Sequence, residues 1–542
     1  MTDTRQQKGR VAHLAVLALL VLVAAFRIRV ADVPLERDEG EYAYAGQLAL
    51  QGVPPYTHVY NMKFPGTYYA YSAIMALGGQ STRAIHLGLM VVNCATIFLV
   101  FALGRRLLDD LTAAVAAAIF ALLTLDRGVL GIWGHATHFA LLFALGGIAL
   151  LVCARHPARV GTLLCAGFLL GTAVLMKQHA AAYFAGGLAL VFHEGLGRGR
   201  RDHWAAVRAA GWLGSGFALP LVAVAAALVG QGVFGKFWFW AITYGREYVN
   251  AVPARDAIPN LLYGLGRVTE KTYLVWGLAA MGLVALVISN WPAKTRTVVI
   301  GLTAISFLAI CPGFYFREHY FILLLPAIAL LAAIALEGAG RLLLRAKAGP
   351  RAARTVSLFL FLVCACQYTL SERHYLFSMS TDDIIRQRYK ANIFLEAVEI
   401  ANYIRGHSAS TDVIAILGSE PEIFFYSGRR SATGHIYVYA MMEAQPHAHR
   451  MQEEMIREIE LAQPLYLVSV KTHASWLSRP ESDKAIFDWA RRYTLDRYDQ
   501  VGIVVADGTG LSRVLWKEPA EESEPRSQTL ARIYRRKGEA IH

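Results

Sequence analysis

Long apolar stretches, separated by short polar connectors, dominate the first 371 residues of the chain. A helix needs roughly 20 apolar residues to cross the hydrocarbon core of a bilayer, and eleven stretches approach that length. They lie at about 11–30, 84–104, 111–125, 130–152, 160–176, 180–195, 209–229, 272–291, 297–312, 320–337 and 355–371. The pattern predicts a mainly α-helical, polytopic membrane protein with about eleven transmembrane helices in residues 1–371.

The pattern changes after residue 371. Amphipathic helical segments such as NIFLEAVEIANYIRG (392–406) alternate with short β-rich runs such as DVIAIL (412–417) and LYLVSV (465–470). This alternation predicts a small α/β domain over 372–517. Residues 518–542 are charged and contain a single aromatic residue, Tyr534, so we expect a disordered tail.

Basic residues in alternate connectors predict the orientation in the membrane. Lysine and arginine gather before the first apolar stretch and in every second connector after it, for example at Arg105 and Arg106. The positive-inside rule assigns these connectors and the N-terminus to the cytoplasm, and an odd number of spans then leaves the α/β domain outside. Arg27 and Arg29, rather than small residues, follow the first stretch, which favours an uncleaved anchor over a signal peptide.

The overall composition agrees with a membrane protein. Hydrophobic residues make up 55% of the chain and charged residues only 17%, and the formal net charge is +13. The excess positive charge lies beside the apolar stretches and forms no basic patch interleaved with aromatic residues, so we expect no nucleic-acid partner.

The first predicted outer loop (31–83) holds most of the candidate chemistry. Three acidic residues, Asp38, Glu39 and Glu41, open the segment RDEGEYAYAGQLALQG, which we expect to be a helix ending near Gly52. In the simplest interpretation, Asp38 and Glu41 cap this helix and complement its dipole. The loop continues with KFPGTYYAY (63–71), whose tyrosines, among them Tyr68, could form an interfacial aromatic belt.

This order of motifs resembles the GT-C fold family of polyprenyl-phosphate-dependent glycosyltransferases, and within it the protein O-mannosyltransferase and lipid A aminoarabinose transferase group. The resemblance covers roughly residues 10–370 and rests on DEGEYAYAGQLALQG, on KFPGTYYAY and on REHYFILLLPAIALLA at 317–332. It implies a catalytic base at Asp38 with Glu39 as its companion, and a donor-phosphate contact at Lys63. It also implies a bacterial cytoplasmic (inner) membrane enzyme, a polyprenyl-phosphate sugar as donor and no covalently bound cofactor.

Elementary chemistry supports one base and one or two cations at such a site. The incoming hydroxyl needs a base on the face opposite the leaving group, and the departing phosphate needs positive charge. Lys177 and Arg317 are favoured over Arg246 as additional phosphate ligands, although Lys177 could be a snorkelling anchor and Arg317 could pair with its neighbour Glu318. Glu41, Tyr68, His138, His319 and Tyr320 are further candidates for substrate contacts.

One departure from the family pattern concerns a second acid. Relatives often carry an acidic residue near the start of the fourth span, where this chain has His135 and His138. Asp126 could replace that acid or could cap a turn. The two histidines could bind a metal, but such a pair more often packs or lines a polar cavity, so no metal ligand is predicted and metal dependence stays open.

Two alternatives to a transferase remain. A transporter or flippase of lipid-linked sugars would place acidic residues or broken helices near the membrane midplane, which the sequence does not show. In the other alternative the α/β domain works alone and the spans only anchor it. The favoured prediction is an inverting transferase, which works in the bilayer with a glycan, lipid or protein as acceptor.

Overall fold

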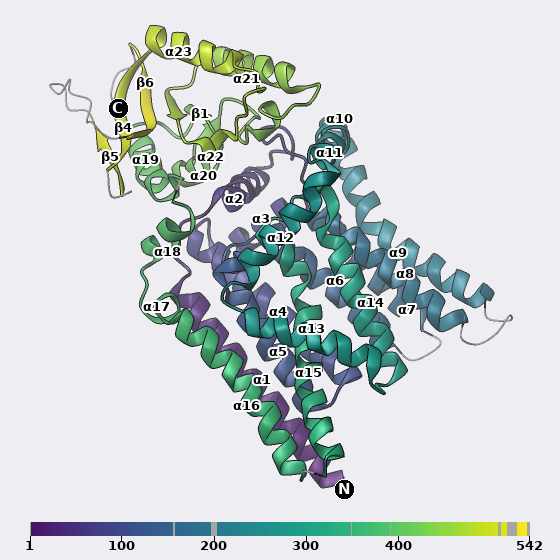
Figure 1. The fold of residues 1–542 in the computed structure, drawn as a ribbon. Helices are drawn as coiled ribbons and strands as arrows, with labels where there is room; N and C mark the ends of the chain where they lie inside the picture. Colours follow the sequence, from purple (N-terminus) through teal and green to yellow (C-terminus); the bar gives the residue numbers. More distant parts are fainter. Residues whose placement is uncertain are drawn as a thin grey trace.

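The computed structural model describes residues 2–154, 158–196, 203–347, 349–390, 392–507, 511–516 and 528–538. These residues form a long helical bundle with a smaller sheet-containing domain at one end (Figure 1). Helices α2 (Arg37–Leu50) and α3 (Gly66–Gly78) lie where the two parts meet, and the N-terminus lies at the far end of the bundle.

Each of the eleven predicted apolar stretches coincides with a helix. These helices are α1 (Thr2–Arg29), α4 (Thr82–Leu107), α5 (Asp110–Leu125), α6 (Ala136–Cys153), α7 (Val160–Met176), α8 (Ala181–Leu196), α9 (His203–Gly230), α13 (Tyr273–Ile288), α14 (Ala293–Ile310), α15 (Leu325–Arg345) and α16 (Pro350–Ser371). Within the described residues, seven helices are long and apolar enough to cross a membrane, or eight if the pair 254–269 and α13, bent by 116°, is one span. The membrane-protein fold is therefore confirmed, and the number of eleven spans stays a prediction.

The basic connectors lie at the end of the bundle far from the sheet-containing domain, which is called the outer domain after its predicted location. Thr295 Oγ1 donates to Leu107 O at 2.7 Å, and Lys294 Nζ donates to Val152 O at 2.9 Å, so the start of α14 lies beside the ends of α4 and α6. The sheet domain sits at the opposite end (Figure 1). The two ends are thus separated as the positive-inside rule requires, and the orientation in the membrane stays a prediction.

Small residues allow the helices of the bundle to approach closely. A Cβ atom at Gly282 of α13 would lie 1.9 Å from the carbonyl oxygen of Leu331 in α15, and one at Gly167 of α7 would lie 2.1 Å from that of Leu213 in α9. Lipid and leucine side chains are equally apolar, so close packing of this kind is a main stabilising contact between membrane helices.

The outer domain is built on one six-stranded sheet of order β2-β1-β3-β6-β4-β5. The strands are β1 (Val413–Leu417), β2 (Arg430–Ser431), β3 (Tyr466–Val470), β4 (Tyr498–Ala506), β5 (Ser512–Trp516) and β6 (Gln528–Arg536). β1 is parallel to β2 and β3, whereas β6 is antiparallel to β3 and β4.

Helices cover both faces of this sheet. Ile414 and Ile416 belong to the same apolar cluster as α19 (Phe394–Gly406). Ala415 and Leu417 share a cluster with residues of α21 (Ala448–Ala462) and α23 (Ala485–Arg497). Successive residues of β1 point to opposite faces of the sheet. Because helices cover both faces, every residue of β1 is apolar.

The predicted disordered tail is partly wrong. Residues 528–536 form β6 in the interior of the sheet, where Ala531 and Ile533 are fully buried, and residues 518–527 and 539–542 lie outside the described residues. A strand between β3 and β4 gains hydrogen bonds on both sides, and this pairing outweighs the charged composition. The outer domain therefore extends beyond residue 517.

Candidate active site between the bundle and the outer domain

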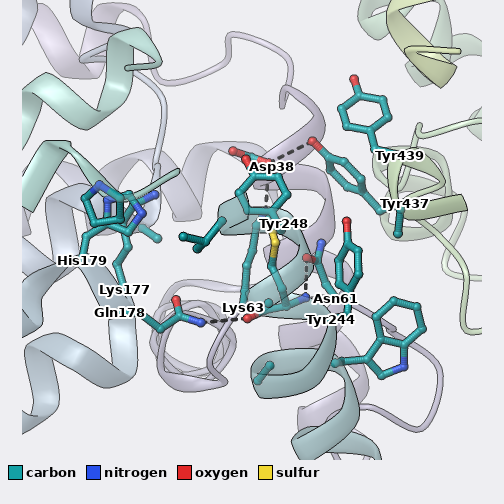
Figure 2. Close-up of a pocket in the computed structure, with 18 of the residues that line it drawn as sticks. Asp38, Asn61, Lys63, Lys177, Gln178, His179, Tyr244, Tyr248, Tyr437 and Tyr439 are labelled. Carbon is teal, nitrogen blue, oxygen red and sulfur yellow. Dashed lines mark hydrogen bonds and ion pairs between the residues drawn. The ribbon is translucent and has the colours of Figure 1, made fainter. Parts of the chain in front are cut away.

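A cavity of about 550 Å³ lies between the bundle and the outer domain. Its walls come from α2, the loop around Lys63, the end of α7, the segment 240–250, the turn around Arg317 and the outer-domain residues 437–443. Figure 2 shows side chains from both parts of the molecule facing this space. The segment 240–250 includes part of a π-helix, Trp238–Tyr244, a rare conformation that often marks functional positions.

Asp38, Glu41 and Lys63 form a buried ionic unit on the inner side of α2. Residues three apart share one helix face, and the Lys63 ammonium lies 2.9 Å from Asp38 Oδ1 and 2.8 Å from Glu41 Oε2. Asn61 Nδ2 and Tyr68 OH also donate to the Glu41 carboxylate, at 2.7 and 2.6 Å. Asp38 and Lys63 reach the cavity wall, while Glu41 and Tyr68 support them from behind.

Glu39 faces the other way. Its carboxylate is fully buried, accepts a hydrogen bond from the backbone N–H of Gly134 and lies 3.1 Å from His86 Nε2. The structure thus brings Glu39 to the junction of α2 with α4 and α6 and not to the cavity. The helix cap also differs from the expected one, because the side chain of Glu36 accepts from the Glu39 N–H and occupies the N-cap position expected for Asp38.

Two tyrosines of α3 do not form the expected interfacial belt. Tyr68 and Tyr71 are almost completely buried, and Tyr71 OH donates to the Gly134 carbonyl at 2.7 Å. Both hydroxyl groups have polar partners in the protein interior, where an unpaired hydroxyl would be costly. The tyrosines therefore fix the loop around α2 from within.

Two histidines stand beside Asp38. His135 Nδ1 lies 3.6 Å from Asp38 Oδ2, and the ring of His135 stacks on His319 with centroids 4.2 Å apart. The donor atoms of Asp38, His135 and His319 all lie within 4.8 Å of one another, the one such group in the part of the chain that the structure describes. One carboxylate and two imidazoles suit Zn²⁺ and related ions, although Lys63 already shares this carboxylate.

The electrostatics of the site keep Asp38 ionised. Burial alone would raise the pKa of Asp38, but the Lys63 ammonium and the His135 imidazole outweigh it and hold this pKa well below its usual value. Burial likewise opposes the charge on Lys63, yet Asp38 and Glu41 raise the lysine pKa well above its usual value. The pair is therefore charged at neutral pH.

Lys177 and Arg317 face the same cavity without a carboxylate at ion-pair distance among the described residues. The Lys177 ammonium lies 4.3 Å from the centre of the Tyr320 ring, and the Arg317 guanidinium lies 5.3 Å from that of Tyr315. Burial lowers the pKa of Lys177 to about 7. Glu318, the expected alternative partner of Arg317, pairs instead with Arg388 at 2.9 Å.

Other predicted residues are divided between the cavity and the protein interior. His319, Tyr320 and Arg246 line the cavity, whereas His138 is buried within α6 and does not. Asp126 is buried near Arg127, away from the cavity, and burial raises its pKa to about 7. His138 and Asp126 are therefore not brought to the ionic unit of α2.

The outer domain supplies site residues that the sequence did not indicate. Tyr437, Tyr439 and Glu443 line the cavity, and Tyr437 OH lies 3.4 Å from Asp38 Oδ1. Arg37 of α2 holds this domain in place through Glu420, at 3.1 Å, and through Tyr439 OH, at 2.7 Å. No local motif marks these residues, because their role depends on how the domain docks.

Comparison with known proteins gives a match to one family model over part of the chain and a shared fold. Residues 62–229 match the family model described as dolichyl-phosphate-mannose-protein mannosyltransferase. No curated protein sequence matches the chain.

Among solved structures, ArnT from Cupriavidus metallidurans in the apo state is 16% identical, with a TM-score of 0.56 over 84% of this chain and 92% of that one. ArnT bound to undecaprenyl phosphate gives a TM-score of 0.54 at the same identity, over 84% of this chain and 93% of that one. The chain has the GT-C fold. The oligosaccharyltransferase AglB from Archaeoglobus fulgidus, in complex with an inhibitory peptide and a dolichol-phosphate, shares it at 12% identity and a TM-score of 0.50, over 95% of this chain and 75% of that one. The GT-C fold that the resemblance of the sequence motifs implies is therefore confirmed.

Proposed function

We propose that this GT-C protein is an integral-membrane glycosyltransferase, which moves a sugar from a polyprenyl-phosphate-linked donor onto an acceptor hydroxyl by a single inverting displacement. The observation that carries the proposal is the cavity itself. It combines an ionised carboxylate, Asp38, with two cations, Lys177 and Arg317, that have no carboxylate at ion-pair distance in the described part of the chain. The family match and the lipid phosphates named in two of the related structures support the same donor class.

Lys177 and Arg317 are the best candidates to hold the donor phosphate. A buried cation without an anionic partner is costly, and a bound phosphate would remove this cost through charge-assisted hydrogen bonds. Lys63, the cation implied by the family resemblance, already balances Asp38 and Glu41. We therefore assign Lys63 to the edge of the phosphate site, where it also keeps Asp38 charged.

Asp38 would act as the base. The acceptor oxygen attacks the anomeric carbon from the face opposite the phosphate, the bond from this carbon to the phosphate oxygen breaks, and the hydroxyl proton passes to Asp38. The low pKa of Asp38 keeps the carboxylate free of a proton before attack. Proton transfer becomes favourable only as the attacking hydroxyl gains acidity in the transition state, while the cations stabilise the charge that develops on the phosphate.

The proposed location follows from the basic connectors and the position of the site. The N-terminus and the basic connectors would face the cytoplasm, and the cavity and outer domain would face outward from a bacterial cytoplasmic membrane. The acceptor would then be a glycan, lipid or protein outside the cytoplasm.

The alternative of a transporter gains no support. Glu337 is the single acidic residue of the seven candidate spans; it pairs with Arg341, one turn further along α15, and does not line the cavity. The alternative in which the outer domain works alone is also disfavoured, because the cavity needs α2 and the bundle as well.

A transfer assay tests the proposed function. Purified wild-type protein and the Asp38→Asn variant are incubated in detergent with lipid-linked sugars extracted from a bacterial membrane, and released polyprenyl phosphate is measured by mass spectrometry. We expect release by the wild type and at least a hundredfold slower release by the variant, since general bases contribute about 10²–10⁴-fold. The absence of release by the wild type, with or without added membrane extract as acceptor, would contradict the proposal.

A further inference from the structure

Glu443 is the one carboxylate of the cavity wall that the proposed mechanism does not use. Its Oε2 accepts a hydrogen bond from Tyr244 OH at 2.8 Å. Within the described residues, no lysine, arginine or histidine lies at ion-pair distance from it. Burial raises the pKa of Glu443 above its usual value, as expected for a carboxylate in a sheltered site. It therefore keeps capacity to accept a further hydrogen bond.

The surroundings of Glu443 are aromatic. Tyr244 and Tyr248 come from the segment around the π-helix, and Tyr437 and Tyr439 come from the outer domain (Figure 2). The Tyr437 and Tyr439 rings pack edge to face with centroids 4.7 Å apart. An apolar wall with a few convergent polar groups is the usual form of a small-molecule site, and aromatic faces combined with a carboxylate match the apolar ring face and the hydroxyl groups of a sugar.

The position of Glu443 favours the donor sugar over the acceptor. Arg317, a candidate phosphate ligand, lines the same cavity as Glu443, and its positive charge partly offsets the rise that burial causes in the Glu443 pKa. In the donor the sugar is bonded directly to the phosphate, so a group beside the phosphate site is also beside the sugar. The acceptor approaches the anomeric carbon from the opposite face, on the side of Asp38.

We propose that Glu443 is a donor-binding, specificity-determining residue, which accepts a hydrogen bond from the sugar of the lipid-linked donor and selects neutral or positively charged sugars over uronic acids. This inference rests on the proposed function and adds the class of sugar. It also gives the outer domain a role, because this domain supplies the sugar contact while the bundle supplies the base and the phosphate ligands. An acidic sugar is disfavoured because its carboxylate would face the carboxylate of Glu443, and neither of the two ionised groups has a hydrogen to donate.

Three lipid probes separate the sugar contact from the phosphate contact and test the class of sugar. Affinities for polyprenyl phosphate, polyprenyl-phosphate hexose and polyprenyl-phosphate uronic acid are measured in the same detergent for wild type, Glu443→Ala and Glu443→Gln. The matched control is Glu453→Gln, because the side chain of Glu453 is 63% exposed on α21. Binding of the lipid without sugar reports folding of the phosphate site in every variant.

We expect the wild type to bind the hexose form more tightly than bare polyprenyl phosphate. Glu443→Ala should keep the affinity for the bare lipid within about twofold and lose roughly 10- to 150-fold in affinity for the hexose form, the usual contribution of a hydrogen bond to a charged group. Glu443→Gln should lose less and should narrow the discrimination against a polyprenyl-phosphate uronic acid. Glu453→Gln should behave as wild type.

Three results would overturn the inference, and they differ in what else they affect. An unchanged hexose preference in Glu443→Ala rejects the sugar contact and leaves the proposed function intact. An equal loss for both lipids in Glu443→Ala means that the residue is structural. If the wild type binds neither lipid, both the inference and the proposed function fail.

Discussion

Lys177 allows the proposed phosphate site to be tested through its pH dependence. Its pKa is lowered from 10.5 to about 7 by burial, so the charged form costs about 5 kcal/mol relative to the neutral amine. The ammonium borders a cavity, which makes this value an upper bound. If the protonated form holds the phosphate, affinity should be greatest below pH 7 and should fall as pH rises.

The size of the effect follows from the same pKa. Each pH unit above about 7 should weaken donor binding about tenfold, until the loss reaches the 10- to 150-fold that a hydrogen bond to a charged group contributes. The probe is a polyprenyl phosphodiester, whose own charge is constant, and its affinity is measured in detergent from pH 6 to pH 9. Lys177→Arg is the matched control, since the guanidinium stays charged and should flatten the profile.

Stability gives an independent readout with a defined sign. The pKa of Lys177 is lower in the folded state than in the unfolded chain, so the cost to folding is fully present below pH 7 and fades as pH rises toward 10.5. Lys177→Met should therefore melt above wild type at pH 6, and the difference should shrink by pH 10. A wild-type affinity independent of pH, or the same slope in Lys177→Arg, would refute this assignment.

Three further predictions concern the ionic unit, the domain contact and metal dependence. Lys63→Ala leaves Asp38 and Glu41 buried without their cation, which should lower the free energy of unfolding by about 3–5 kcal/mol and lower the melting temperature in detergent. An unchanged melting temperature would contradict the burial of this ionic unit. Gly40→Ala places a Cβ 2.6 Å from a backbone nitrogen of α20 (Glu422–Ser427), so it should reduce turnover and expose the outer domain to limited proteolysis. Gly161→Ala, which meets nothing within 4 Å, should change neither. A chelator should leave turnover unchanged, because the positive charges of Lys63, Lys177 and Arg317 oppose binding of a dication to the group formed by Asp38, His135 and His319. Turnover that is lost in chelator and restored only by added Zn²⁺ or Mn²⁺ would contradict this prediction.

The helices of the bundle could be predicted because their signal is local. An apolar run of spanning length has few alternatives in a membrane protein, and each of the eleven runs forms a helix. The outer strands with unbroken apolar runs were equally clear. β6 was missed because its sequence, QTLARIYRR, alternates few apolar residues with arginines, and only pairing with β3 and β4 makes it a strand.

Part of the candidate site also follows from helical geometry. Asp38 and Glu41 are three residues apart and share a face with Lys63 between them, whereas Glu39 points elsewhere. The same reasoning cannot decide which face meets a cavity, and for this reason the sequence could not separate His138 from His135. Glu443 was beyond sequence reasoning, since no motif surrounds it.

The most direct test of the central claim is mass spectrometry of the lipids retained by purified wild type, Asp38→Asn and a Lys177→Ala/Arg317→Ala double variant. The account predicts that Asp38→Asn retains an intact polyprenyl phosphate sugar, because binding is preserved while the base is lost, and that the double variant retains none. If Asp38→Asn holds no such lipid and added donor does not bind to any of the three proteins, the account of this cavity as a lipid-linked sugar site is contradicted.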